Sequence, residues 1–339
     1  MNLKKIIFKK SILFIQILFL VLFLGGCNSG IINEENQIYA WPIATASPED
    51  TVTQIFAEKF AEEVEKLSDG KMIINVYSNS VLGGDRELLE SCKDGDIPFV
   101  VQNTAPQVSF IKEASVFDLP CVFSNIQEVR NAVDNEEFFD VMKNAYENAG
   151  YRLMGYSDQG FRVMSTNKLV ESFNDFKGQK IRTMENPYHI LFWKSINARP
   201  TPMTFSEVYI GLQQKTIDAQ ENPYEVIVSN KLNEQQKYII ETNHLPHLIS
   251  LIVSDKFYSK LSETQQTIID EAAKTAIEYS RNESDKRIQE RIEYIESTGT
   301  EIIPVSEELR SEMVSASKGV YDSIADTVGD GLISLYVGK

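Results

Sequence analysis

The order of apolar and polar positions predicts strands and helices in alternation along the first half of the chain. Short apolar stretches typical of strands are QIYAWPIAT, MIINVYS and IPFVVQN. Between them lie EDTVTQIFAEKFAEEVEKLSDG and DRELLESCKDG. Their apolar residues recur every three or four positions, and they end at Gly70 and Gly95, as helices do. Strands that alternate with helices indicate parallel pairing through helical crossovers.

The alternation continues after residue 150. The predicted strands are YRLMGYSD, FRVMSTN, KIRTM, IDAQ and YIIETNH. A helix is predicted over TFSEVYIGLQQK, because Thr204 and Glu207 have the spacing of a capping box. About 300 residues follow the N-terminal segment, more than one hydrophobic core usually serves, so we expect two lobes.

A long helix is predicted over residues 262–298, which contain neither glycine nor proline. Ser262 and Gln265 form a second capping box at its start, and an intermittent apolar stripe follows. At about 1.5 Å per residue the helix would be about 55 Å long, more than the width of one small lobe. We therefore expect both lobes to share it; a break near Asn282 is the alternative.

The N-terminus predicts secretion and attachment to a membrane. Four lysines and no acid among the first ten residues, followed by an apolar run over residues 11–24, are typical of a secretory signal. Leu24-Gly25-Gly26-Cys27 resembles the lipobox of bacterial lipoproteins. Residues 1–26 are therefore expected to be a signal peptide, Cys27 to carry lipid and residues 27–36 to be a tether. An uncleaved anchor is the alternative; both place the remaining chain outside the cytoplasm, at a membrane surface.

The expected mature chain is strongly acidic. Removing the four lysines from the chain's 33 basic residues leaves 29 against 49 acidic ones, a net charge near −20. This charge argues against a nucleic-acid partner, because binding to phosphates needs clustered Lys and Arg. In such an acidic chain, an arginine that lies among apolar residues is a stronger indication of a binding site.

The sequence predicts no cofactor and no metal. His244 and His247 are close in sequence, but the proline between them disrupts the helical spacing of a metal site, so we expect a structural role for both. Cys92 and Cys121 are able to form one disulfide in an oxidising compartment, although we expect both to be free thiols.

The tetrapeptide Glu-Asn-Pro-Tyr occurs twice, at residues 185–188 and 221–224, each time between a predicted strand and a helix-like run. Asparagine is a favoured N-cap and proline is favoured at the first helical position, so helices are predicted to begin at Pro187 and Pro223. In open parallel sheets, the carboxyl ends of strands and the following helix N-termini face one crevice, where ligands bind. Helix N-termini favour an anion there.

Two arginines near this crevice are candidates for binding a carboxylate. Arg182 lies in KIRTM, just before the first Glu-Asn-Pro-Tyr, and Arg162 lies in FRVMSTN, twenty residues earlier. A guanidinium aimed into the crevice would bind a carboxylate through two parallel hydrogen bonds. A solvated arginine on an edge strand is the alternative for both.

From about Gln37 to its C-terminus, the chain resembles the substrate-binding proteins of tripartite ATP-independent periplasmic (TRAP) transporters, the DctP family. The resemblance rests on FKGQKIR, PTPMTFSEVYIGLQQ and QENP, in order and spacing, and on YSNSVLGGDRELLESCKDG and FDLPCVFSN in the N-terminal half. It implies an α/β, two-lobed periplasmic-binding-protein-like fold with parallel and mixed sheets, hinge strands and a long helix shared by both lobes. The lobes expected are 37–158 with 248–285, and 159–247 with 286–339.

The resemblance implies a protein that closes on an organic acid and delivers it to integral-membrane TRAP permease subunits, without catalysis. It implies that Arg182 clamps the ligand carboxylate and that Arg162 adds a second contact. Asn222 and Phe205 are implied to lie at the ligand as well. The N-terminal lobe is expected to add Gln102 and Asp85, for which a strand cap and a helix start are the structural alternatives.

The chain departs from the family pattern at Met184 and Glu185, where the family often has a proline. Glu185 would repel a second carboxylate or accept hydrogen bonds from ligand hydroxyls. A sugar acid or another hydroxylated monocarboxylate is therefore favoured over a C4-dicarboxylate. Two other functions remain open: a ligand-sensing lipoprotein of the same fold and, with less support, an extracytoplasmic sugar-acid enzyme. The enzyme would need a pair of catalytic carboxylates that the sequence does not locate.

Overall fold

A mixed sheet of nine strands runs through the part of the chain that the structure, a computed structural model, describes: residues 37–338. The order of its strands is β2-β1-β3-β8-β4-β7-β5-β6, with β9 paired to β8. The strands are β1 (Tyr39–Ala44), β2 (Met72–Tyr77), β3 (Phe99–Asn103), β4 (Tyr151–Thr166), β5 (Lys180–Thr183), β6 (Arg199–Pro202), β7 (Ala219–Asn222), β8 (Tyr238–Ser254) and β9 (Glu301–Pro304).

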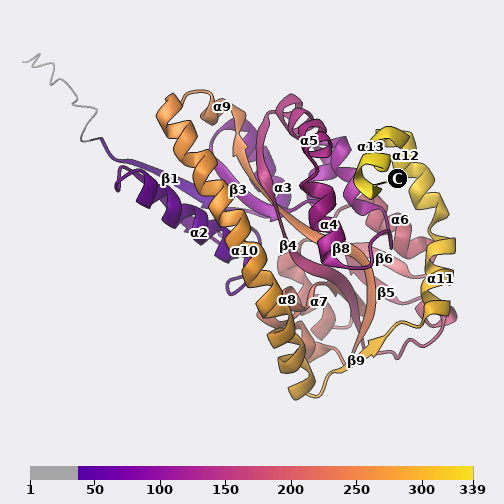
Figure 1. Ribbon diagram of the computed structural model, residues 1–339. Coiled ribbons are helices and arrows are strands. Elements are labelled where there is room, and N and C mark those ends of the chain that lie inside the picture. Colours follow the sequence, from indigo (N-terminus) through magenta and orange to yellow (C-terminus); the bar gives the residue numbers. More distant parts are fainter. Residues whose placement is uncertain (1–36, 339) are drawn as a thin grey trace, which may run out of the picture. The chain divides into compact units, whose positions relative to one another are not determined.

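Helices flank this sheet (Figure 1). They are α2 (Val52–Leu67), α3 (Asp85–Asp94), α4 (Ile126–Val133), α5 (Glu136–Ala149), α6 (Pro187–Ser195), α7 (Val208–Gln213), α8 (Tyr224–Ser229), α9 (Asp255–Tyr258), α10 (Glu263–Ser297), α11 (Glu307–Ala316), α12 (Lys318–Val328) and α13 (Asp330–Val337). Short 3₁₀ turns are η2 (Ala105–Ser109), η3 (Lys112–Asp118), η4 (Phe173–Phe176), η5 (Phe205–Glu207) and η6 (Leu232–Gln235).

The pairing of the strands divides the sheet into two parallel groups joined by two long antiparallel strands. In one group β1 pairs in parallel with β2 and β3, and in the other β5 pairs in parallel with β6 and β7. Strands β4 and β8 are antiparallel to each other, and each pairs with one of the groups: β8 with β3, and β4 with β7. The expected mixed sheet is confirmed, and the two groups form the sheets of the two lobes.

The prediction of two separate strands, YRLMGYSD and FRVMSTN, was wrong, because both belong to the single strand β4. Gly155 and Gly160 have φ values of +150° and +74° and lie at irregularities in the pairing with β8, so the strand bends there without ending. A Cβ atom at these positions would collide with Ile277 and Ile288 of α10. Strand β8 likewise runs far beyond the predicted YIIETNH, to Ser254.

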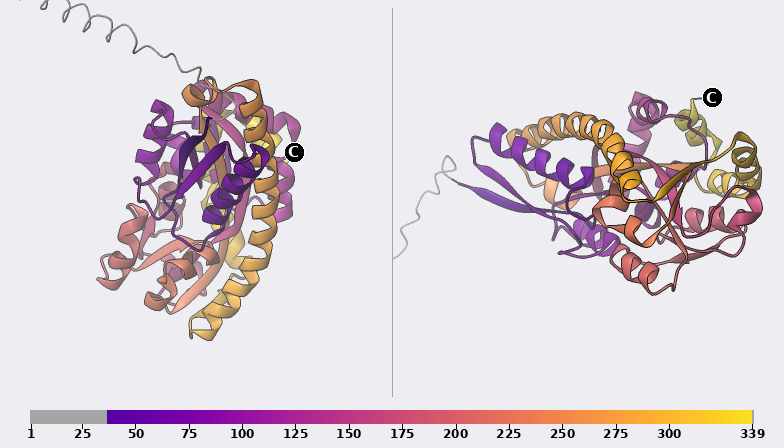
Figure 2. Two further views of the ribbon diagram at one scale, coloured as in Figure 1. Left: turned by 90° about the vertical axis from the view of Figure 1, so that its left-hand side faces the viewer. Right: turned by 90° about the horizontal axis from the view of Figure 1, so that it is seen from below.

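Helix α10 is continuous over 35 residues, so the break near Asn282 does not occur (Figure 1). Its first half contributes Ile269, Ala272 and Ala276 to a core that contains β1, β3 and α2. Its second half packs Ile292 and Ile295 in another core, with residues of α7, α8 and β4. The views in Figure 2 show α10 beside α2 and continuing past it toward α8. The expected helix shared by both lobes is confirmed.

The capping predictions were partly right. Ser262 and Gln265 form the predicted capping box, and Asn186 caps α6 with Pro187 as its first residue. Thr204 and Glu207 do not: within the described residues the Thr204 side chain makes no capping bond, because the 3₁₀ turn η5 precedes α7. Asn222 is the last residue of β7 and Pro223 caps α8, so the second predicted helix begins one residue late.

The expected signal peptide, lipid-bearing Cys27 and tether lie outside the described residues. Among residues 37–338, no helix has the length and apolarity needed to cross a membrane. Within the same range Cys92 and Cys121 are free thiols, Cys92 buried and Cys121 half-buried. Burial raises the pKa of the Cys121 thiol to about 11, which makes it a poor nucleophile.

Candidate ligand-binding site

A pocket lies where strands β1, β3, β5 and β7 end. Residues 46–48 after β1 and Glu185 after β5 line it, together with Asn103 and Asn222, the last residues of β3 and β7. The outer part of the pocket has a volume of about 420 Å³. It is continuous with an inner recess, because both are lined by Ala46, Asp85, Arg182, Met184 and Phe205. The carboxyl ends of parallel strands are where open α/β sheets bind ligands.

Arg182 provides the buried positive charge of this pocket. Strand β5 carries it, and it is 2% exposed. Its Nε and Nη2 atoms donate to the Met203 carbonyl at 3.0 and 2.7 Å, while Nη1 has no hydrogen-bond partner among the described residues. Burial lowers the pKa of Arg182 to about 10, with Glu221 the largest opposing influence. A buried guanidinium nitrogen without a partner favours an anion beside it.

Carboxylates line the pocket as well. Asp85 begins α3 and lines both parts of the pocket, and Glu185 lines the outer part from the loop after β5. Burial raises the pKa of Asp85 to about 6, against the lowering effect of Arg182. Arg86 is the neighbouring cation, with its Nε atom 3.7 Å from the Glu185 carboxylate. Asp85 and Glu185 therefore present hydrogen-bond acceptors to the pocket.

Arg162 lies behind the pocket in a buried ion pair with Glu221. Its Nε and Nη2 atoms donate to the Glu221 carboxylate, and Nη2 also reaches Asn222 Oδ1 at 3.2 Å. Nη1 contacts His247 Nδ1 at 2.5 Å. Both Asn222 and His247 line the inner recess, so Arg162 holds two residues of its wall. Arg162 and Arg182 are thus brought close to one site, but with different surroundings.

All three histidines of the chain surround this ion pair. His244 Nε2 lies 3.1 Å from Glu221, and His189 joins Glu221 to Asp118, whose Oδ1 atom is 3.0 Å from His189 Nε2. Burial would lower the pKa of His189, but Asp118 and Glu221 outweigh burial and raise it to about 9. Within residues 37–338, no cluster of His, Cys, Asp and Glu suits a metal ion.

The two Glu-Asn-Pro-Tyr segments both contribute residues to the pocket, but their residues have different structural roles. In the first, Glu185 is exposed at the pocket and Asn186 accepts hydrogen bonds from the N–H groups of Tyr188 and His189. In the second, Glu221 is fully buried against Arg162, and Asn222 donates to Gln220 Oε1 at 2.6 Å instead of capping a helix. The same four residues therefore differ in role because one asparagine ends its strand and the other follows it.

Gln102 does not reach the pocket; the neighbouring Asn103 does. Successive side chains of a strand point to opposite faces, so Asn103 of β3 faces the recess and Gln102 faces the buried side near Ser250. Asn103 is held there by its bonds to the Leu248 carbonyl, at 2.8 Å, and from the Ala105 N–H, at 2.9 Å. The expected pocket residue of β3 was therefore wrong by one position, because a shift of one residue along a strand moves a side chain to the other face.

Comparison with protein families identifies the fold. The family model of the bacterial extracellular solute-binding proteins, family 7 (DctP), matches residues 43–327. The chain belongs to this family. The resemblance expected from the sequence is therefore confirmed, and the protein is a TRAP-type solute-binding protein of a family that acts outside the cytoplasm.

Solved structures of the DctP family agree with this assignment. The sugar acid binding protein DctPAm from Advenella mimigardefordensis, in complex with galactonate, has a TM-score of 0.85 and 27% identity, over 89% of this chain and 97% of that one. A TRAP protein from Haemophilus influenzae with bound L-gulonate has a TM-score of 0.84 and 31% identity, over 89% and 100%. One from Shewanella oneidensis with bound succinate has 0.85 and 27%, over 89% and 99%.

Sequence reasoning missed several pocket residues of this DctP-family protein. Ser47 and Pro48 follow β1, and Ser80 and Glu87 flank the start of α3. The first two were accessible to the rule that ligands bind beyond the carboxyl ends of parallel strands, because β1 was predicted. Ser80 was accessible to the same rule, because it follows the predicted strand β2. Glu87 had no such signal, since it lies within α3.

Proposed function

We propose that this solute-binding protein captures a sugar acid or another hydroxylated monocarboxylate and delivers it to TRAP permease subunits in the membrane. The observation that carries the proposal is Arg182, whose buried Nη1 atom has no partner among residues 37–338 and whose side chain lines both parts of the pocket. A carboxylate beside it would complete the guanidinium's hydrogen bonds. A C4-dicarboxylate is the second candidate.

The chemistry of the other residues that line the pocket supports a hydroxylated ligand. Ser80, Thr204 and Ser206 offer hydroxyl groups, and Asp85 and Glu185 offer carboxylates, all around the outer part of the pocket. Such groups pair with ligand hydroxyls and disfavour a second ligand carboxylate. The galactonate and L-gulonate of the two similar proteins have this pattern of one carboxylate and several hydroxyls.

Other residues have supporting roles in this proposal. Phe205 packs an aromatic ring against the ligand, since it lines the pocket beside Arg182. Asn222 contacts the ligand from the inner recess, and Asn103 takes the place expected for Gln102. Arg162 acts by holding Asn222 and His247, since it lines neither part of the pocket itself.

Binding and closure are coupled in this proposal. Micromolar affinity needs about 8 kcal/mol, whereas each charge-assisted hydrogen bond contributes about 1.5–3 kcal/mol, so closure must bury the rest of the ligand. We place the lobes at 37–158 with 248–285, and at 159–247 with 286–339. The hinge then lies at the irregular pairing between Asp158 and Phe161 of β4, opposite Pro246 and Leu248 of β8.

We further propose that Cys27 carries the lipid that holds the protein at the outer face of the membrane, and that the protein catalyses no reaction. A ligand sensor of the same fold is the alternative. Mass spectrometry of the membrane-extracted protein tests the anchor: an N-terminal peptide that begins with diacylated Cys27 supports it, and a soluble protein with an unmodified N-terminus contradicts it.

A thermal-shift screen of the full-length protein against aldonates, uronates, C4-dicarboxylates, keto acids and amino acids tests the cargo. We expect a hydroxylated monocarboxylate to raise the melting temperature by several degrees. Recovery of the unchanged acid would support transport over catalysis. No shift with any acid, in protein shown to be free of bound ligand, would contradict the proposed function.

A further inference from the structure

A second group of charged residues joins the two lobes beside the pocket. Arg287 and Arg291 lie one turn apart on α10, and their Nη2 atoms contact the two carboxylate oxygens of Asp50, each at 2.6 Å. Their Nε atoms contact the two oxygens of Glu225 on α8, at 2.8 and 3.2 Å. Two arginines and two carboxylates thus form a closed ring of charge-assisted hydrogen bonds.

Three members of the ring are better shielded than the residues of an ordinary surface ion pair. The side chain of Glu225 is 2% exposed and those of the two arginines are 16% exposed, whereas that of Asp50 is 64% exposed. Both arginines also donate to the Asp50 backbone carbonyl, at 2.9 and 3.2 Å. Networks with this geometry are worth more than isolated exposed pairs, which contribute little.

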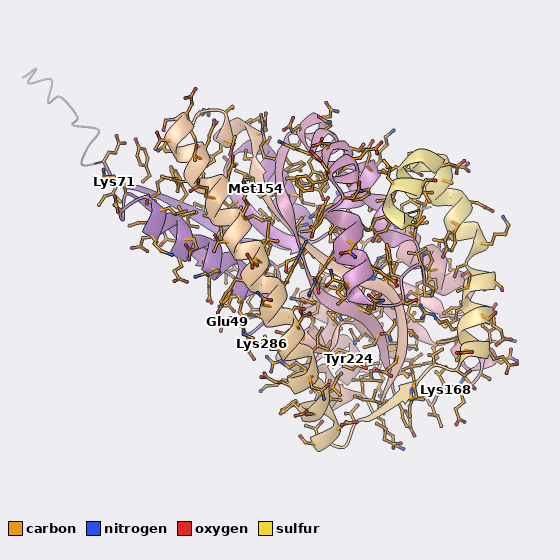
Figure 3. All side chains as sticks on the ribbon, in the orientation of Figure 1. Glu49, Lys71, Met154, Lys168, Tyr224 and Lys286 are labelled. Atoms are coloured by element: carbon orange, nitrogen blue, oxygen red, sulfur yellow. The ribbon has the colours of Figure 1, made fainter. Side chains whose placement is uncertain are left out.

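Asp50 is the one member of the ring that comes from the other lobe. It lies between β1 and α2, whose side chains pack in the core around β1, β3 and the first half of α10. Glu225 follows Tyr224 of α8, and the two arginines precede Ile288 and Ile292. Tyr224, Ile288 and Ile292 all pack in the core around α7 and α8. Figure 3 labels Glu49, Lys286 and Tyr224, the neighbours of three ring members, around this junction.

Residues close in sequence to Asp50 and Glu225 line the inner recess. Residues 46–48, which precede Asp50, line the recess from one lobe, and Val226, next to Glu225, lines it from the other. The segment is stiff: Thr51 Oγ1 donates to the Pro48 carbonyl at 2.9 Å, and Asn79 N–H donates to the Ser47 carbonyl at 2.7 Å. Holding Asp50 therefore holds this wall of the recess against α8.

We propose that Arg287 and Arg291 are positioning residues: with Asp50 and Glu225 they form a closure lock that fixes residues 46–48 over the bound ligand and slows its release. This inference rests on the proposed function, since a lock of this kind matters where lobes close on a ligand. When the lobes separate, Asp50 leaves the ring, while the bonds of the arginines to Glu225, all within one lobe, stay.

The test compares Asp50→Asn with Asp134→Asn in the full-length protein. Asp50 has a φ of +57°, which asparagine tolerates, so the exchange removes charge without new backbone strain. Asp134 is the matched control: it pairs with Arg281 of the same helix at 2.6 and 2.8 Å and is similarly exposed, but does not line the pocket. Arg291→Lys, which keeps the charge and loses the fork, is the second variant.

The measurement is the rate of association and dissociation of galactonate and L-gulonate, by stopped-flow fluorescence, with the melting temperature of the ligand-free protein. We expect Asp50→Asn and Arg291→Lys to raise the dissociation rate about 5- to 30-fold, with little change in association or in ligand-free melting. Asp134→Asn should behave as the wild type.

Three results would overturn the lock. Wild-type dissociation rates in both ring variants would show that the ring does not restrain the bound form. If the melting temperatures of the ligand-free and the ligand-bound protein fell by the same amount in those variants, that result would show that the ring has a purely structural role. If the wild type binds neither acid nor any other in the panel, the proposed function fails and the lock fails with it, so the wild-type binding curve distinguishes the two failures.

Discussion

The guanidinium of Arg182 lies over the ring of Phe205, with its Cζ atom 5.8 Å from the ring centroid. The ring covers one side of a charge whose Nε and Nη2 atoms are already bonded to the Met203 carbonyl. Together these contacts fix the direction of Nη1, which has no protein partner within the described residues. In the proposed role, Arg182 is therefore held in place before the ligand arrives, which would reduce the cost of ordering it on binding.

Replacing this arginine should abolish binding. We expect Arg182→Ala to lower the affinity for galactonate or L-gulonate by about 100-fold or more, because two charge-assisted bonds are lost. Arg182→Lys should recover little, since a point charge does not replace the fork. Isothermal titration calorimetry measures the effect. Arg199→Ala, on the exposed neighbouring strand β6, is the control; retained binding in Arg182→Ala would contradict the role of the clamp.

Glu185 should exclude a second carboxylate. We expect Glu185→Gln to improve the affinity for galactarate relative to galactonate by about 3- to 10-fold, the scale of one like-charge repulsion in a partly solvated pocket. Competition binding with both acids gives the ratio directly. Glu90→Gln serves as the control, because Glu90 also lies 3.7 Å from Arg86 but does not line the pocket. An unchanged ratio in Glu185→Gln would contradict this role.

Ligand binding should strengthen as the pH falls from about 8 to 6. Burial raises the pKa of Asp85 to about 6, and Arg182 opposes this rise. A bound carboxylate would neutralise Arg182, so the pKa of Asp85 rises further and the complex takes up a proton. Calorimetric titrations at pH 8 and pH 6 test this. Asp85→Asn should flatten the dependence; an equally steep profile in that variant would assign the proton to another group.

The free energy of unfolding should fall as the pH rises from about 6.5 to 9. Asp118 and Glu221 raise the pKa of His189 to about 9 despite burial, so its protonated form stabilises the fold fully below about pH 6.5 and loses this effect through pH 9. The rise from 6.5 to about 9, at about 1.4 kcal/mol per pKa unit, corresponds to a loss on the order of 3 kcal/mol. Urea unfolding across this range measures it. In His189→Gln this fall in unfolding free energy between pH 6.5 and 9 should disappear. If it persists, other groups cause it.

Much of the local structure was accessible from the sequence. Ser262 with Gln265, Asn186 with Pro187, and Gly95 each mark a helix end through a few neighbouring residues, and the structure has these ends as predicted. The absence of Gly and Pro over residues 262–298 likewise predicted the long helix. Such signals are read correctly because capping and propensity act within one or two turns.

The phase and length of strands were harder to predict. The family resemblance suggested Gln102, and the sequence pattern divided β4 at its glycines, whereas the structure turns Asn103 to the pocket and keeps β4 continuous. Both outcomes depend on β8, which lies about 70 to 150 residues away in sequence and pairs with both strands. No local pattern states which partner a strand will have.

The sequence by itself determined the compartment, the alternation of strands and helices, the shared helix and Arg182 as a candidate ligand residue, because each depends on residue type and short-range spacing. Tertiary structure alone decided that three scattered histidines surround Arg162 and Glu221, and that Asp50 meets Arg287 and Arg291 across 237 and 241 residues. The first set of contacts arises when one lobe folds and the second when the two lobes pack, since their energy depends on burial and on distances that the chain sets by folding.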